Sequence, residues 1–199
     1  QSGFGITPII GVDWKLGKLN LAAKYEFRTK INLENESKNS ANVDAMMPAY
    51  ADGAKVRSDI PAILTLGAEV EALKNLRVAA GFHYYWDKDA KGTPINEGDN
   101  TWEANFGVEG DVTNKLTLSF GLQTTNYGFE DADMKDTNFN INSNALLFGG
   151  AYKFNEHFKL NVGYMHSFYS SHDFVNANGT ACNYTRENDV VGVSLDMKF

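Results

Sequence analysis

The chain has 199 residues, 43% of them apolar and 13% aromatic, with a formal net charge of −7. Its length fits one domain, and its acidic balance argues against a nucleic acid partner, because phosphate binding requires clustered basic side chains. The sequence contains no stretch of about 18 apolar residues and therefore no transmembrane helix, although a β-strand that faces lipid at every second residue stays possible. Cys182 is the single cysteine and can form no internal disulfide. No signal peptide begins at Gln1, so we expect a mature protein or an internal segment.

Apolar and polar residues alternate along several segments. From Leu19 to Leu33, apolar side chains at odd positions oppose mostly polar or charged side chains at even positions, and the pattern recurs over 76–87, 115–127 and 158–171. Successive side chains of a strand point to opposite faces, so each segment predicts a strand with one apolar and one polar face. In chain order, we predict nine strands at residues 3–14, 19–33, 59–72, 76–88, 100–112, 115–128, 143–154, 158–172 and 187–199.

Short and long connections alternate between these strands. Short turns are predicted at 15–18, 73–75, 113–114 and 155–157, and long polar loops at 34–58, 89–99, 130–142 and 172–186. Short turns at one rim and long loops at the other are typical of outer-membrane β-barrels. The sequence therefore predicts an all-β fold, a transmembrane antiparallel β-barrel in the Gram-negative outer membrane.

A soluble β-sandwich or a lipocalin-like barrel is the alternative, because its strands alternate too, with the apolar face turned inward. Glycines on the polar faces and aromatic residues at the strand ends, such as Trp14 and Phe154, count against it.

The strand count is uneven, whereas bacterial single-chain barrels have even numbers of strands. The segment 3–14 runs toward a short turn, so Gln1 would begin at the long-loop side. We interpret the chain as the C-terminal part of a larger barrel that lacks an odd number of strands. The alternative is a complete eight-stranded barrel in which 3–14 is not a strand.

Two hairpins carry a family resemblance. The segment 59–90, "DIPAILTLGAEVEALKNLRVAAGFHYYWDKDA", resembles a hairpin of the FadL/TodX family of fatty acid and hydrocarbon transporters, and "GVDWKLGKLNLAAKYEFRTKINLE" resembles the preceding one. The run Tyr84 to Asp87 suggests a Bacteroidetes-type member. The resemblance implies fourteen strands around an N-terminal plug, so that residues 1–199 form a single β-barrel domain containing strands six to fourteen, with the plug and the first strands absent.

The resemblance also implies a function, passive transport of hydrophobic compounds such as long-chain fatty acids across the outer membrane. The alternative is a structural or general porin-like barrel without a specific hydrophobic substrate. In the longest loop, Met46, Met47 and Tyr50 form an apolar cluster, which needs a partner if it is exposed. In the family, the corresponding loop helps to capture the ligand, so these residues are candidate substrate-binding residues. Packing of the cluster on its own barrel rim is the other interpretation.

Charged side chains of both signs share the polar faces of neighbouring strands. This mixture favours pairing of the charges with one another within a wet lumen. The alternative is that one or two of them bind the ligand directly. A tight turn would place Glu71 opposite Arg77, and the next would place Asp111 opposite Lys115. The candidate lumen-lining residues are Lys24, Glu26, Arg28, Glu69, Glu71, Arg77, His83 and Glu103.

No catalytic or metal site is expected. Ser171, His172 and Asp173 are adjacent and alternate faces along a strand, so they cannot form a triad among themselves. His166 with Ser170 is a formal candidate, since outer-membrane phospholipases use a Ser–His pair on the outer wall. Acidic residues at 131, 133 and 136 suggest a calcium loop, but Lys135 stands where an oxygen ligand is required and the glycine is missing. The sequence thus predicts neither an enzyme nor a cofactor.

The last strand carries a predicted assembly signal. Val191, Val193, Leu195, Met197 and Phe199 form an outward apolar ladder that ends at the carboxylate. This ladder resembles the terminal signal that the barrel-assembly machinery recognises. The expected partners are therefore membrane lipid, a hydrophobic small-molecule ligand and, through Phe199, the assembly machinery.

Overall fold

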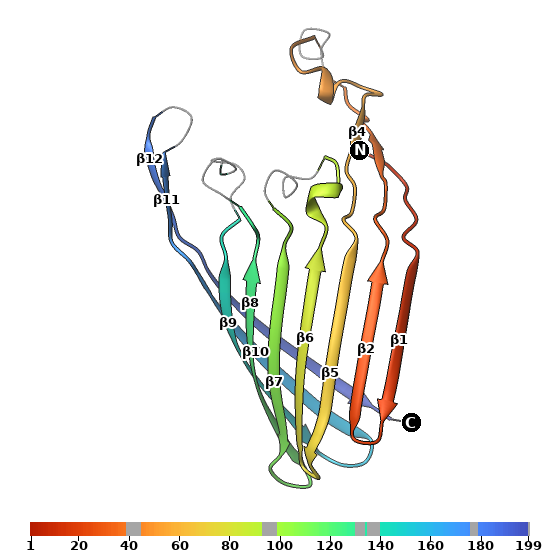
Figure 1. The fold of residues 1–199 in the computed structure, drawn as a ribbon, viewed down its shortest axis with the longest axis vertical. Coiled ribbons are helices and arrows are strands. Elements are labelled where there is room, and N and C mark those ends of the chain that lie inside the picture. Colours follow the sequence, from red (N-terminus) through yellow and green to blue (C-terminus); the bar gives the residue numbers. More distant parts are fainter. Residues whose placement is uncertain (39–44, 93–98, 130–133, 135–139, 176–178, 199) are drawn as a thin grey trace.

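The structure is a computed structural model that describes residues 1–38, 45–92, 99–129, 134, 140–175 and 179–198. Nine antiparallel strands form one sheet in the order β1-β2-β5-β6-β7-β8-β9-β10-β13, so each strand pairs with its neighbours in the chain (Figure 1). Their bounds are Ile9–Leu16 (β1), Leu19–Glu26 (β2), Ile63–Leu73 (β5), Leu76–Tyr85 (β6), Trp102–Asp111 (β7), Leu116–Asn126 (β8), Ser143–Lys153 (β9), Phe158–Tyr169 (β10) and Glu187–Met197 (β13).

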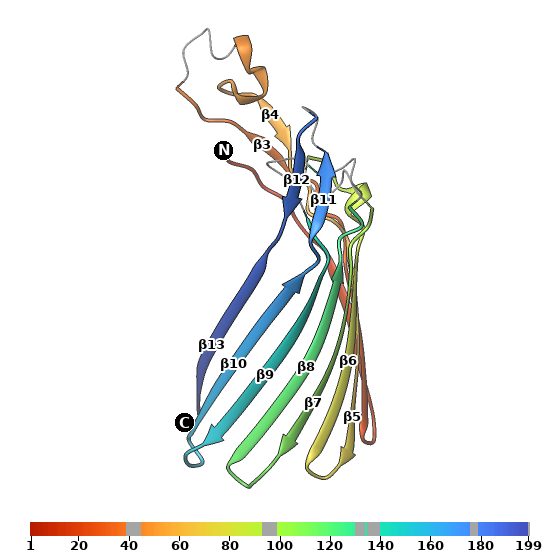
Figure 2. The same ribbon diagram turned by 90° about the vertical axis from the view of Figure 1, so that its left-hand side faces the viewer.

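The sheet is strongly curved and forms a trough, as the two views in Figures 1 and 2 show. Short turns connect the strands at one end, which we call the short-turn rim, and the long connections 27–62, 86–101, 127–142 and 170–186 form the long-loop rim at the other. Within the described residues, β1 and β13 are the two edges and do not pair with each other. The trough is therefore an open part of a barrel wall.

All nine predicted strands are confirmed, but the ladder ends earlier than the alternation predicts. The segment 3–14 joins the sheet only from Ile9, and 19–33 leaves it after Glu26. Proline has no backbone N–H to donate, and Pro8 and Pro61 stand just before β1 and β5. Beyond these prolines, isolated bridges such as Thr29 with Ile60 replace the continuous ladder.

Two small hairpins rise from the long-loop rim, and the first begins at the end of the predicted strand 19–33. The strands β3 (Asn32–Glu34) and β4 (Lys55–Arg57) pair in the first connection, and β11 (His172–Val175) and β12 (Ala181–Tyr184) pair in the last. Two 3-10 turns, η1 (Pro48–Tyr50) and η2 (Asp87–Asp89), complete the described elements. No described helix has the length and apolar character needed to cross a membrane.

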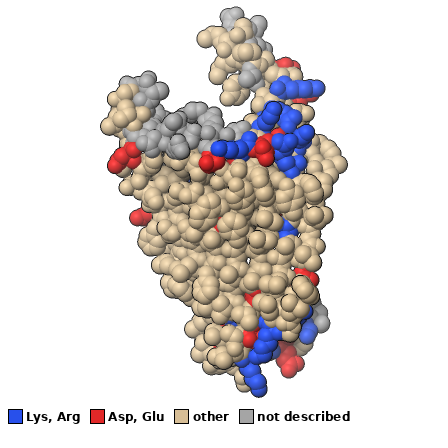
Figure 3. Space-filling view, viewed as in Figure 1, with Lys and Arg blue, Asp and Glu red and all other residues tan. Residues whose placement is uncertain are grey.

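The apolar residues lie on the outside of the trough. Among the described residues only Ala62, Ala90, Met134, Ile141 and Ala145 form a buried apolar set, whereas large apolar side chains on the convex face stay exposed. The face seen in Figure 3 has a broad band nearly free of charge between charged belts at the two rims. A soluble barrel buries its apolar face, so this arrangement excludes the soluble alternative. Outward-facing examples are Leu66, Phe106, Leu118, Phe148, Val162, Val191 and Val193.

The two faces of β13 should tolerate a charge very differently. Val193 faces outward with 68% of its surface exposed, and its neighbour Ser194 faces inward opposite Asn161. Val193→Lys should destabilise the membrane-inserted barrel by about 2–4 kcal/mol, because it places an ammonium group in hydrocarbon. Ser194→Lys is the control and should have little effect. Urea unfolding of the full-length protein in liposomes measures both; an equal cost for the two variants would contradict the assignment of the faces.

Candidate functional site

Polar side chains line the inner wall of the trough in two clusters on β6, β7 and β8. The lower cluster lies near the short-turn rim. Arg77 donates to Glu109 through Nη2 and through Nε, the latter at 3.0 Å, and its Nη2 lies 3.7 Å from Asp111 Oδ1. Thr117 Oγ1 donates to the same Asp111 oxygen at 2.7 Å. The lower cluster thus connects three strands across the inner face.

Of the two predicted cross-turn pairs, one is confirmed only in its register and the other is wrong. Glu71 does stand opposite Arg77, but the guanidinium group of Arg77 turns to Glu109 on the other neighbouring strand. Asp111 stands opposite Thr117 rather than Lys115. The reason is the turn length: Val112 and Thr113 both donate their backbone N–H to the carbonyl of Leu116, so the turn is longer than predicted.

The upper cluster lies near the long-loop rim and is centred on Glu103. Its carboxylate accepts hydrogen bonds from the Tyr85 hydroxyl at 2.9 Å, Thr125 Oγ1 at 3.0 Å and Gln123 Nε2 at 3.3 Å. His83 Nδ1 lies 3.4 Å from the Tyr85 oxygen and 3.7 Å from Glu103 Oε2. His83 and Glu103 were predicted to line the lumen, whereas their three neutral partners were missed. Tyr85, Gln123 and Thr125 lie on the polar faces of their strands, as the charged residues do, and this alternation is the sequence signal that could have identified them.

The other predicted lumen residues lie at different heights. Lys24 and Glu26 share the inner face of β2 and form an ion pair at 2.7 Å. Glu69 and Arg77 both line a hollow of about 790 Å³ on the concave side. Arg28 lies beyond the end of β2, where its guanidinium group donates to the carbonyl oxygen of Asp89 at the long-loop rim.

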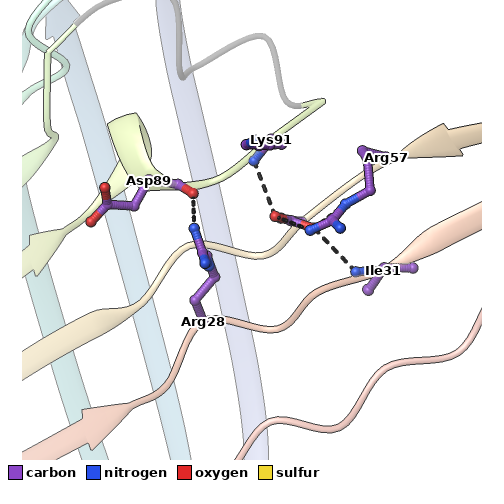
Figure 4. Close-up of polar contacts among 6 residues, drawn as sticks. Arg28, Ile31, Arg57, Asp89 and Lys91 are labelled. Carbon is purple, nitrogen blue, oxygen red and sulfur yellow. Dashed lines mark hydrogen bonds and ion pairs between the residues drawn. The ribbon is translucent and has the colours of Figure 1, made fainter.

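A buried carboxylate, Asp59, ties the long connections together, and Figure 4 labels its donors Arg57, Ile31 and Lys91. Only 2% of the residue is exposed. Arg57 donates to both of its oxygens, at 3.0 Å from Nε to Oδ1 and 2.7 Å from Nη2 to Oδ2. The backbone N–H groups of Ile31 and Lys91 each donate to it at 3.2 Å. Three separate segments of the long-loop rim therefore converge on one side chain.

Burial by itself raises the pKa of Asp59, but the hydrogen bonds from Arg57, Ile31 and Lys91 outweigh it and hold the pKa below the usual value of 3.8. Because the folded-state pKa is lowered, the stabilisation by this carboxylate is fully present above the unfolded value and is lost as pH falls through the folded one. At neutral pH, Asp59 is a charged anchor.

The predicted substrate-binding residues of the longest loop are exposed. Met46 has 83%, Met47 51% and Tyr50 59% of its surface exposed, and η1 stands above the sheet at the end of the β3–β4 hairpin (Figure 1). These side chains therefore do not pack on the part of the rim that the structure describes. Their exposure leaves an apolar surface on the loop that can meet a partner.

The catalytic and metal candidates of the sequence are not assembled. His166 and Ser170 are four residues apart along an extended chain, which separates them by about 13 Å. Among the described residues, no group of three histidine, cysteine or acidic side chains could hold a metal ion. The acidic positions 131, 133 and 136 lie outside the described residues.

No protein-family model and no curated protein sequence matches the chain, but solved structures share its fold. A FadL homologue of Pseudomonas aeruginosa matches with a TM-score of 0.67 and 17% identity over 94% of this chain and 50% of that one. The toluene transporter TodX of Pseudomonas putida matches with a TM-score of 0.59 and 20% identity over 98% and 50%. The siderophore receptor PirA of Acinetobacter baumannii matches with a TM-score of 0.54 and 11% identity over 99% and 34%.

The fold therefore defines a Gram-negative outer-membrane β-barrel, present here in part. Within that class, the chain is similar to the FadL homologue and TodX and spans about half of their length. The resemblance inferred from the two hairpins is confirmed at the level of the fold.

Removing the Asp59 carboxylate should loosen the long-loop rim. Asp59→Ala leaves Arg57 and two backbone N–H groups without their acceptor and should lower the local unfolding free energy by about 1–3 kcal/mol. Limited proteolysis of the full-length protein should then cut the connections around 27–62 and 86–101 faster. Asp99→Ala is the matched control, because Asp99 forms an exposed ion pair with Lys88 and should leave cleavage unchanged. Equal cleavage of both variants would show that Asp59 does not anchor the rim.

Proposed function

We propose that the chain is the C-terminal part of an outer-membrane channel for the passive uptake of hydrophobic compounds, such as long-chain fatty acids. One observation carries the proposal: a trough with an apolar outer wall and a polar inner wall on the fold of the FadL homologue and TodX. TodX is a toluene transporter, and a TodX variant of similar fold is named a monoaromatic hydrocarbon channel. The proposed role requires transport and no enzymatic step.

The missing part of the wall supplies the remaining strands in this proposal. Residues 1–199 form a single barrel domain, and five further strands would bring the count to an even fourteen around an N-terminal plug. The unpaired edges of β1 and β13 support this, because each edge presents backbone groups that need a partner within a membrane. Pairing of β1 with β2 over its whole length counts against the eight-stranded alternative.

In this proposal, the ligand first contacts the protein at Met46, Met47 and Tyr50. Methionine is unbranched and polarisable and adapts to flexible chains, and tyrosine adds apolar area with a polar tip. A hydrocarbon chain that buries about 100 Å² on this cluster gains roughly 2.5 kcal/mol. That is sufficient for transient capture and too little for tight retention.

The inner wall keeps the lumen wet. Lys24, Glu26, Glu69, Glu71, Arg77, His83 and Glu103 line it, with charges of both signs close together. Such local pairing supports a structural role for most of them, without selection of one ion. A general porin is the second candidate, favoured by the polarity of this wall; free conductance of the full-length protein in planar bilayers, with no copurifying hydrophobic ligand, would establish it.

The capture role is tested by uptake. Cells with the full-length protein in which Met46, Met47 and Tyr50 are replaced by serine should need a higher concentration of a labelled long-chain fatty acid for half-maximal uptake, because the first apolar contact is lost. Val175→Ser is the matched control, since Val175 is an exposed apolar residue (66%) on the other hairpin. The amount of assembled protein is measured in parallel. Unaltered uptake by the triple variant would end the capture role.

The outward ladder of β13 is proposed as the signal for the barrel-assembly machinery. Val191, Val193, Leu195 and Met197 expose at least half of their surface on the outer face, and Phe199 lies outside the described residues. Deletion of Phe199 should lower the amount of heat-modifiable, assembled barrel in the outer membrane, whereas Phe199→Tyr, which keeps the ring, should preserve it. Normal assembly after the deletion would refute the signal.

A further inference from the structure

Cationic side chains gather on the outer face of the molecule at the long-loop rim. Figure 3 shows them above β2 and β5, where the three segments anchored by Asp59 meet. Arg57 donates to the Asp59 carboxylate through its side chain, and Ile31 and Lys91 donate to it through their backbone N–H groups. Lys30 directly precedes Ile31 in the chain. The anchor therefore holds the backbones of three cationic residues, Lys30, Arg57 and Lys91, close together.

These cations outnumber the carboxylates around them. Arg28 joins them, because its guanidinium group donates to the backbone carbonyl of Asp89, and the Asp89 carboxylate points away from Arg57 and Lys91 (Figure 4). Within the part of the chain that the structure describes, no carboxylate forms an ion pair with Arg28, Lys30 or Lys91. We call Arg28, Lys30, Arg57 and Lys91 the cationic group. Its positive charge is only partly balanced by the buried carboxylate of the anchor.

An aromatic cluster lies just below the cationic group on the outer face. Tyr25 on β2 contacts the rings of Phe27 and Trp86, with 4.8 Å and 5.6 Å between the ring centroids. Trp86 also contacts Tyr84 on β6 at 4.9 Å. Tyrosine and tryptophan side chains mark the interface between membrane and water. Because Arg28 directly follows Phe27, the cationic group lies at the height of the lipid headgroups.

We propose that the cationic group binds the phosphate groups of lipopolysaccharide, whose acyl chains lie against the aromatic cluster. The fold places the chain in the Gram-negative outer membrane, and the lipid of the outer leaflet there is lipopolysaccharide, a glycolipid with phosphorylated sugars. The long-loop rim faces that leaflet. An arginine can bind a phosphate through two parallel N–H donors, and a lysine binds it as a point charge. The excess of cations and the charge of the headgroup are therefore complementary.

The site does not depend on the missing part of the barrel. The strands below the cationic group, β2, β5 and β6, each pair on both sides within the described sheet, and further strands would join at the edges of β1 and β13. The site requires an outer wall that faces lipid and is independent of what the lumen transports. Failure of the uptake experiment therefore leaves this site intact, and the reverse also holds.

Native mass spectrometry of the full-length protein in detergent tests the site. The probes are two forms of lipid A with identical acyl chains, one with two phosphate groups and one with a single phosphate group. The wild-type protein should retain the form with two phosphates preferentially. Lys30→Gln combined with Lys91→Gln should lower this preference by about five-fold, as expected for the loss of cations near a membrane surface. The backbone N–H groups that hold the Asp59 anchor remain in this variant, so limited proteolysis of the rim should be unchanged.

Lys74→Gln combined with Lys115→Gln is the matched control. Both lysines are exposed in turns of the short-turn rim, which faces the other leaflet, so the same loss of charge should keep the wild-type preference. Added salt should weaken the preference of the wild-type protein, because it screens exposed charges. Equal retention of the two lipid A forms by the wild-type protein overturns the proposal. So does an unchanged preference in the variant of Lys30 and Lys91, or an equal loss of preference in the control variant.

Discussion

The structure depends on one constraint: backbone N–H and C=O groups in hydrocarbon must be paired within the protein. The antiparallel ladder from β1 to β13 satisfies this for the interior strands, and its two-residue period then assigns each side chain to lipid or to the lumen. Because of this assignment, the apolar side chains of the outer wall are exposed and the described residues include few buried apolar side chains. The same constraint leaves β1 and β13 as edges that a complete barrel has to pair.

Polar interactions perform on the inner wall the stabilising role that a hydrophobic core performs elsewhere. The Arg77 and Glu103 clusters link β6, β7 and β8 near opposite rims. Between them, the wall is kept thin by inward-facing glycines. A Cβ at Gly81 would lie 2.6 Å from Asn105 Oδ1, and the Ser119 hydroxyl lies over Gly149 in the same way. Side chains from neighbouring strands can therefore lie flat against the wall, which keeps space in the lumen.

The long-loop rim is held by buried carboxylates. Asp59 collects donors from three segments, and Asp87, also 2% exposed, accepts the backbone N–H of Thr101 at 2.9 Å. These anchors lie at the base of the connections, whereas Met46 and Met47 stand exposed on the first hairpin. The connections therefore have an anchored base, and the first hairpin has an exposed apolar tip.

The two-residue period by itself predicted nine strands, each with one apolar and one polar face, because the alternation is local. It also predicted that Lys24, Arg77 and Glu103 lie on the polar faces of their strands, and in the structure these faces form the concave wall of the trough. Which partner each charge takes was decided only by the tertiary structure. Arg77 has acidic neighbours on both adjacent strands and turns to Glu109, and Asp111 meets Thr117 because of the length of a turn. The contact between Tyr164, His166 and Asp189 joins β10 and β13, which the long connection 170–186 separates in the chain. Lateral neighbours depend on register and turn geometry, which alternation along one strand does not contain.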